Sequence, residues 1–174
     1  MKPVCLMFIT LFCLSFSCTQ EQKTGDSPEN VTSTYYFIRH AEKDRTDPSD
    51  KDPHLTEVGK ARAAHWSVIL GEVKFDAVYS TDYIRTKETA QPTAAKNNLE
   101  LKIYDPNAID ATSFLKDTKG QTVLIVGHSN TTPKFVNKIL GHKKYDDIDD
   151  SDNGKLFIVT VAGDIISDQV LTIN

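Results

Sequence analysis

Four residues that can bind or transfer an anion follow apolar runs in this chain of 174 residues. Arg39 and His40 come directly after YYFI, Arg85 follows FDAVYSTDYI, and His128 follows TVLIVG. Ligands of open α/β sheets collect at the carboxyl ends of the strands, so we expect these side chains to lie close together. Two guanidinium and two imidazole groups would form a cationic pocket. Removing these groups from water is costly unless a multiply charged anion, such as phosphate, binds them.

Phosphoryl transfer is the chemistry that these residue types favour. Arg39 and Arg85 can donate bidentate hydrogen bonds to the equatorial phosphoryl oxygens without losing their charge. A neutral imidazole is a nucleophile toward phosphorus, so one of His40 and His128 can form a phosphohistidine while the other binds an oxygen. The helix after GHSNTTP would also direct its first backbone N–H groups toward the anion.

The apolar pattern around these residues indicates an α/β domain with a largely parallel sheet. It predicts strands near 34–39, 76–80, 100–104, 122–127, 155–161 and 165–172, and helices near 56–71, 82–97, 108–117 and 132–140. We expect Asp82 and Thr132 to be N-caps, Pro133 to take the first helical position, and Pro92 to kink or restart its helix. The short turn AGD predicts that the last two strands pair antiparallel at the sheet edge.

Four segments resemble, in order, the motifs of the histidine phosphatase superfamily. RHAEK is similar to its RHG motif, LTEVGKARA to LTxxGxxQA, STDYIRTKETA to SxLxRAxQTA, and VGHSN to GHSG. The resemblance spans Arg39 to Asn130 and implies the phosphoglycerate mutase-like fold, a three-layer sandwich with a mostly parallel central sheet flanked by helices. It also implies that His40 is the nucleophile, with Arg39, Arg85 and His128 holding the phosphate.

The sequence departs from the family pattern at several positions near these motifs. Ala41 stands where the family usually has Gly, Lys43 where Ser or Thr is common, Thr46 where many members place a phosphate-binding Asn, and Arg62 where Gln is usual. Lys43 or Arg45 could contact the substrate, but solvated loop charges are the interpretation that we favour.

A leaving-group oxygen needs a proton donor, and the family commonly uses a carboxyl group just beyond the third strand. Asp105 is our choice because it lies at the strand end, although an Asp before Pro106 is also a common turn former. Asp110, further along the following helix, and Glu42 are the alternatives.

No cofactor and no catalytic metal are expected, since no Cys/His grouping or carboxylate cluster lies near His40 in the sequence. The acidic stretch YDDIDDSDNGK partly resembles a calcium loop, but Thr160 stands where the bidentate Glu should be, so we interpret the stretch as a solvated loop. The other histidines, His54, His65 and His142, are interpreted as structural.

The first seventeen residues are typical of an export signal, and LSFSC resembles a bacterial lipobox ending at Cys18. We therefore expect a signal peptide at 1–17, a flexible tether at 18–33 and a histidine phosphatase domain at 34–174, anchored to a membrane through lipidated Cys18 and facing the periplasm or cell exterior. The formal charge of −4 and the lack of a basic tract predict no nucleic-acid partner.

Together these features predict a metal-independent phosphohydrolase that acts on a phosphomonoester or a protein phosphohistidine. Only seventeen residues separate Tyr104 from Thr122, which leaves no room for a sizeable cap, so the site should be open to varied phosphorylated small molecules or phosphoproteins. A phosphoglycerate-mutase-type transferase and a lipoprotein that binds phosphate or a partner without turnover are the alternatives.

Overall fold

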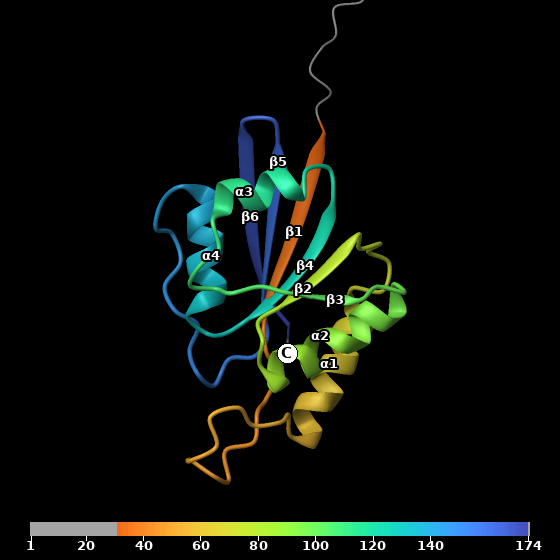
Figure 1. Cartoon of the computed structure of the whole chain (residues 1–174), viewed down its shortest axis with the longest axis vertical. Helices are drawn as coiled ribbons and strands as arrows, with labels where there is room; N and C mark the ends of the chain where they lie inside the picture. Colours follow the sequence, from red (N-terminus) through yellow and green to blue (C-terminus); the bar gives the residue numbers. More distant parts are fainter. Residues whose placement is uncertain (1–30, 174) are drawn as a thin grey trace, which may run out of the picture.

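A six-stranded sheet forms the centre of the molecule in the computed structural model, which describes residues 31–173 (Figure 1). The predicted signal peptide, Cys18 and most of the predicted tether lie outside the described residues. Between residues 31 and 173, no helix is long and apolar enough to cross a membrane.

Within residues 31–173, six strands and four helices alternate along most of the sequence, as the apolar pattern predicted. The strands are β1 (Thr32–Arg39), β2 (Ala77–Ser80), β3 (Leu101–Ile103), β4 (Thr122–Gly127), β5 (Lys155–Ala162) and β6 (Ile165–Thr172). The helices are α1 (Glu57–Ile69), α2 (Ile84–Lys96), α3 (Ala111–Asp117) and α4 (Thr131–Leu140).

The sheet is mixed, with the strand order β3-β2-β4-β1-β5-β6. The first four strands in that order are parallel, whereas β5 runs antiparallel to β1 and pairs antiparallel with β6. In the parallel part, Arg39 is in register with Gly127, and Ser80 with Val126. The carboxyl ends of β1, β2 and β4 therefore meet at one edge of the sheet.

Helices cover both faces of the sheet, which confirms the predicted three-layer architecture. Tyr35 and Phe37 of β1 belong to a core cluster that includes Phe114 of α3 and Phe135 of α4. On the opposite face, side chains of β1, β2 and β4 pack with Trp66 of α1, with its C-cap residue Leu70, and with Ala90 and Ala94 of α2. Successive strand residues point to opposite faces, so strands that are buried on both faces read as continuous apolar runs.

Strand β1 begins at Thr32, so Thr32 and Ser33, which we assigned to the tether, are paired with β5. Ser33 is buried, and its hydroxyl accepts a hydrogen bond from the backbone N–H of Gly120 at 2.8 Å. Because Thr32 and Ser33 are polar, the apolar pattern does not reveal that they belong to the strand. The predicted strand start at residue 34 is therefore two residues too late.

Both predicted N-caps are wrong. The N-cap of α2 is Tyr83, which makes no side-chain cap, and the backbone N–H of Ile84 donates instead to the Asp52 carboxylate of a distant loop at 2.8 Å. The N-cap of α4 is Asn130, so Pro133 is the third helical residue and Thr132 is buried within the first turn. Helix α2 continues through Pro92 without a restart.

Candidate active site

A cavity of about 830 Å³ opens at the carboxyl ends of the parallel strands. The residues that line it include all five predicted catalytic residues, Arg39, His40, Arg85, Asp105 and His128. They come from the ends of β1, β3 and β4 and from the first turn of α2, so the sheet topology alone brings them together. The cavity is also lined by the start of α4 and the two residues before it, Ser129–Thr131.

His40 is held rigidly at the end of β1. Its backbone N–H donates to Gly127 at 2.9 Å, and its carbonyl accepts from the Asn153 side chain at 2.8 Å. The residue is 4% exposed, and burial, opposed by a hydrogen bond to Ala41 and reinforced by the nearby Arg39, lowers its pKa to about 3. The imidazole is therefore neutral near pH 7.

The tautomer of His40 follows from its hydrogen bond. Nδ1 lies 2.7 Å from the backbone carbonyl oxygen of Ala41, which can only accept, so Nδ1 carries the proton. Nε2 then holds the free lone pair. A neutral ring with an unprotonated Nε2 is the form that can attack phosphorus.

His128 lies beside His40, with the ring centroids 5.4 Å apart. Its Nε2 is 2.9 Å from the Thr81 hydroxyl, and its Nδ1 is 3.5 Å from Nη2 of Arg85. The ring packs edge-on against Tyr83, with the centroids 4.8 Å apart. Burial, followed by the charges of Arg85 and Arg39, lowers the pKa of His128 to about 4, so the second imidazole is also neutral near pH 7.

Arg39 is 1% exposed, and part of its guanidinium is already engaged. Nη1 donates to the backbone carbonyls of Asp149 and Asp152 at 2.9 and 3.1 Å, and Nη2 donates to the carboxylate of Asp150 at 2.5 Å. Three of the five guanidinium N–H groups are thus used. Nε is buried and has no partner among residues 31–173.

Arg85 contributes the second guanidinium. It packs over the Tyr83 ring at 4.4 Å and lies 3.3 Å from the Asp52 carboxylate. Burial lowers its pKa from the ordinary value, opposed by the charge of Asp52, but an arginine remains charged at neutral pH. Its Nε, like that of Arg39, is buried without a partner in the described part of the chain.

A family model supports the interpretation of this geometry. Residues 35–106 match the histidine phosphatase superfamily (branch 1), a range that includes Arg39, His40 and Arg85. This part of the chain is similar to the histidine phosphatase superfamily. His128 lies beyond the matched residues, and the fold places it against His40.

Solved structures with this fold cover about four-fifths of the chain. They include Bacillus stearothermophilus YhfR (18% identity, TM-score 0.62, 79% of this chain and 96% of that one) and the protein histidine phosphatase SixA complexed with tungstate (16%, 0.61, 80% and 96%). A third is a mutant of Entamoeba histolytica phosphoserine phosphatase in complex with phosphoserine (13%, 0.59, 79% and 95%). At these identities the likeness shows the fold alone. No curated protein matches the chain at a significant level.

The second histidine phosphatase motif, LTEVGKARA, positions the loop that follows His40. The N–H of Thr56 donates to the carbonyl of Glu42 at 2.9 Å, and the Thr56 hydroxyl caps α1 through the N–H of Gly59. A Cβ on Gly59 would lie 2.2 Å from the Glu42 carbonyl oxygen, so only glycine permits this close approach. From the third motif, Thr89 accepts the N–H of Ala41 at 2.9 Å.

The three carboxylates considered as proton donors lie in different places. Asp105 lines the cavity, and its carboxylate also accepts the N–H of Asn107 at 2.8 Å, so it forms the turn that the Pro106 context suggested. Asp110 is the N-cap of α3 and lines a separate groove. Glu42 pairs with Arg62 at 2.8 Å and is not among the residues that line the cavity.

Two charged loop residues that we considered differ in position. Lys43 lines the cavity, and its pKa is lowered by burial and by the charge of Arg85. Arg45 instead pairs with Asp150 at 2.7 Å. His54 is not among the residues that line the cavity. Its Nδ1 lies 2.6 Å from the carboxylate of Glu88, in keeping with a structural role.

The interpretation of the acidic stretch as a solvated loop is wrong in part. Asp149, Asp150 and Asp152 all bind Arg39, and Asn153 binds the His40 carbonyl, although Asp150 is 64% exposed. The sequence analysis also missed Asp52 and Tyr83, the neighbours of Arg85. Asp52 and the acidic-stretch residues carry no local signal, because their partners lie far away in the sequence. Tyr83 lies only two residues from Arg85, but an aromatic residue beside an arginine does not by itself indicate a contact.

Proposed function

We propose that the chain is a metal-independent phosphohydrolase that acts through a phosphohistidine on His40. The similarity of residues 35–106 to the histidine phosphatase superfamily supports phosphatase activity. The proposed phosphohistidine mechanism is supported mainly by the state of His40, which is a buried, neutral imidazole with its lone pair on Nε2. Two arginines lie beside it, and each has a buried Nε–H donor without a partner within residues 31–173.

In the first step, Nε2 of His40 attacks the phosphorus atom and the ester P–O bond breaks. The leaving-group oxygen takes a proton from the carboxyl group of Asp105. The phosphorylated ring is stabilised by the hydrogen bond from Nδ1–H to the Ala41 carbonyl. Arg39 and Arg85 donate to the phosphoryl oxygens, where negative charge accumulates in the transition state.

In the second step, a water molecule attacks phosphorus, the N–P bond breaks and the proton lost by the water returns to the Asp105 carboxylate. Inorganic phosphate leaves and His40 is again neutral. Before phosphate binds, Nδ1 of His128 accepts from Nη2 of Arg85, and its Nε2–H donates to the Thr81 hydroxyl, which itself donates to Thr86. His128 donates to a phosphoryl oxygen through Nδ1–H once Arg85 has turned from the ring to the phosphate. The N–H groups that precede α4 have no intrahelical partner and add to the same anion site.

The substrate in this proposal is a phosphomonoester or a phosphohistidine on a protein. The cavity has no cap over it in the 105–121 segment, which forms only a turn and the short helix α3. The fold neighbours named for phosphoserine and for protein histidine phosphatase activity favour the same range of substrates, and tungstate is a tetrahedral oxyanion like phosphate. The location in this proposal is outside the cytoplasm, on a membrane, through acylated Cys18.

The test is hydrolysis of p-nitrophenyl phosphate by the purified domain with and without EDTA. Wild type should turn over equally in both conditions, because two arginines and His128 hold the oxygens that a metal would otherwise hold. His40→Ala should lose at least about 10³-fold in kcat, as expected for loss of a nucleophile. His54→Ala, which alters an exposed histidine outside the cavity, is the matched control and should be unaffected. Full activity of His40→Ala, or activity restored only by a divalent ion, would overturn the proposal.

A further inference from the structure

Strand β6 forms one edge of the sheet and lacks the features that protect edge strands from pairing. Natural edge strands are kept short, carry Lys or Pro, or are interrupted by bulges. The opposite edge, β3, follows this rule, since it has three residues and one of them is Lys102. Strand β6 has eight residues, contains no Lys, Arg, Pro or Gly, and pairs with β5 without a bulge. Between residues 31 and 173 it is therefore the one long, unprotected edge.

The direction of the backbone groups of β6 follows from its pairing with β5. The N–H of Ile173 donates to the carbonyl of Gly154 at 2.8 Å, so the odd-numbered residues of β6 direct their N–H and C=O groups toward β5. The residues that direct theirs away from the sheet are Ile166, Asp168, Val170 and Thr172. Within residues 31–173, the N–H and C=O groups of these four residues have no backbone partner. They form a regular row of donors and acceptors.

Exposed aliphatic side chains flank this row on both faces of the sheet. They are Ile165 and Leu171 on one face and Ile166 and Val170 on the other, with exposed fractions between 39% and 73%. A strand with free backbone groups and exposed aliphatic side chains is a template for the addition of another strand.

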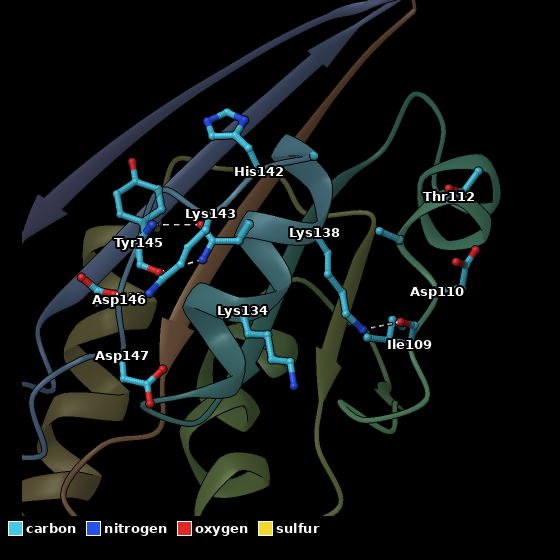
Figure 2. Close-up of a pocket in the computed structure, with 13 residues that line it drawn as sticks. Ile109, Asp110, Thr112, Lys134, Lys138, His142, Lys143, Tyr145, Asp146 and Asp147 are labelled. Carbon is cyan, nitrogen blue, oxygen red and sulfur yellow. Dashed lines mark hydrogen bonds and ion pairs between the residues drawn. The ribbon is translucent and has the colours of Figure 1, made fainter.

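The single charged residue of β6 is neutralised within its own chain. Lys144 donates to the carboxylate of Asp168 at 2.8 Å, and Tyr145 donates its hydroxyl to the same carboxylate. In the view of the groove along α4, Tyr145 lies beside the strands drawn in blue (Figure 2). The side chain of Asp168 is 11% exposed, so no free charge along β6 opposes the approach of another strand.

A second copy of the chain has the self-complementary edge that this row requires. Two copies of one strand related by a two-fold axis pair antiparallel. With Asp168 opposite Val170 of the partner subunit, all four outward-facing residues of each copy exchange two hydrogen bonds with the partner. This register also places Ile166 opposite Thr172, and Gln169 opposite its own symmetry mate. A register centred on Asp168 would instead bring two like charges together, and one centred on Val170 would leave Ile166 unpaired.

The amino-terminal part of the same chain lacks the side chains to cover this edge. Residues 19–30, which lie just before β1, contain no aliphatic or aromatic residue, and they include Gly25, Pro28 and four charged residues. Such a sequence disfavours a strand and offers nothing to pack on the exposed aliphatic side chains. Residues 1–17 are the predicted export signal.

We propose that two copies of the chain associate through antiparallel pairing of their β6 strands, which joins the two sheets into one. Strand β6 runs parallel to β1, so its carboxyl end lies at the same edge of the sheet as the cavity. In the antiparallel partner that end points the opposite way. The two cavities therefore open at opposite ends of the dimer and stay accessible, and the inference does not depend on the proposed phosphohydrolase function.

The test is disulfide cross-linking of the full chain, purified in detergent and oxidised with copper phenanthroline. Gln169→Cys should give a disulfide-linked dimer, because residues that face each other in a non-hydrogen-bonded antiparallel pair have Cα atoms about 4.5 Å apart. Ser167→Cys is the matched control, since this residue is exposed on the same face of β6. Its two copies would lie about four residues, or roughly 14 Å, apart along the strands, which is beyond the reach of a disulfide.

The register is tested by combining two variants. Ser167→Cys and Leu171→Cys should each give no linked dimer alone, but the two chains expressed together should become linked, because these positions face each other across the axis. Wild type, which retains Cys5, Cys13 and Cys18, measures the background from the native cysteines.

Val170→Pro removes an outward N–H of β6 that β5 does not use, and proline is tolerated at such edge positions. Added to Gln169→Cys, it should raise the protein concentration for half-maximal cross-linking about 30-fold, because two hydrogen bonds are lost across the axis. Hydrolysis of p-nitrophenyl phosphate should be unchanged.

No linked dimer from Gln169→Cys, or equal yields from Gln169→Cys and Ser167→Cys, would overturn the inference. A monomer in which the outward N–H groups of β6 are protected from hydrogen exchange would assign the edge to the amino-terminal part of the same chain, and would overturn it as well.

Discussion

The neutrality of the buried His40 predicts a measurable dependence of stability on pH. Its pKa is about 3 in the folded protein and about 6.5 when unfolded. Because the folded value is depressed, the contribution to stability is fully present above pH 6.5 and is lost as the pH falls toward 3. The unfolded chain binds a proton over this range that the folded protein does not.

The size of the effect at pH 5 follows from the unfolded state. At that pH, about 1.5 units below the ordinary value, protonation of His40 favours unfolding by about 2 kcal/mol, at about 1.4 kcal/mol per unit. His40 of the folded protein is still neutral there, so this figure holds for any folded pKa well below 5. His128, with a pKa of about 4, adds a loss of similar size.

The assay is urea unfolding of the domain at about pH 7.5 and about pH 5, in wild type and in His40→Asn, which keeps a donor for the Ala41 carbonyl. Wild type should lose about 2 kcal/mol more free energy of unfolding between the two pH values than the variant does. His54→Asn, at an exposed position, should behave like wild type. Equal losses in wild type and His40→Asn would refute the neutral, buried imidazole.

Three further predictions concern the loop, the proton donor and the anchor. Asp150→Asn should tighten inhibition by phosphate about fivefold, because it removes the negative charge beside Nη2 of Arg39 while two backbone carbonyls still hold the guanidinium. Weaker inhibition by phosphate would mean that Asp150 mainly orients Arg39. Asp105→Asn should slow hydrolysis of alkyl phosphates by roughly 10²–10⁴ but spare aryl phosphates, and equal small effects in the two rate assays would remove Asp105 from the mechanism. Cys18→Ser should move the protein from the membrane to the soluble fraction on cell fractionation, and retention by the membrane would contradict lipidation at this residue.

The sequence was sufficient to place the strand ends and hence the cavity. Arg39, His40 and His128 follow apolar runs that are buried on both faces of the sheet, and such runs are hard to mistake. Parallel pairing then forces their ends to one edge, so the side chains meet without any knowledge of loop structure. The family motifs added the choice of His40 over His128 as the nucleophile.

The sequence could not supply contacts made between distant segments. Asp150 and Asn153 reach Arg39 and His40 across more than a hundred residues, and an acidic stretch reads as solvated when its partner is unknown. The predicted N-cap of α2 failed for the same reason, since Asp52 of a distant loop, in place of Asp82, accepts the N–H of Ile84. Only the folded chain reveals which polar groups satisfy one another.

The central claim, that His40 is the nucleophile, is tested most directly by trapping its phosphorylated form. Brief reaction with a ³²P-labelled phosphomonoester, followed by denaturation and peptide mapping, should give an acid-labile, alkali-stable label on the peptide that contains His40. The label should be absent from His40→Ala and retained in His54→Ala. Label on another residue, or wild-type turnover with no trapped phosphohistidine in either rapid-quench or steady-state samples, would contradict the account.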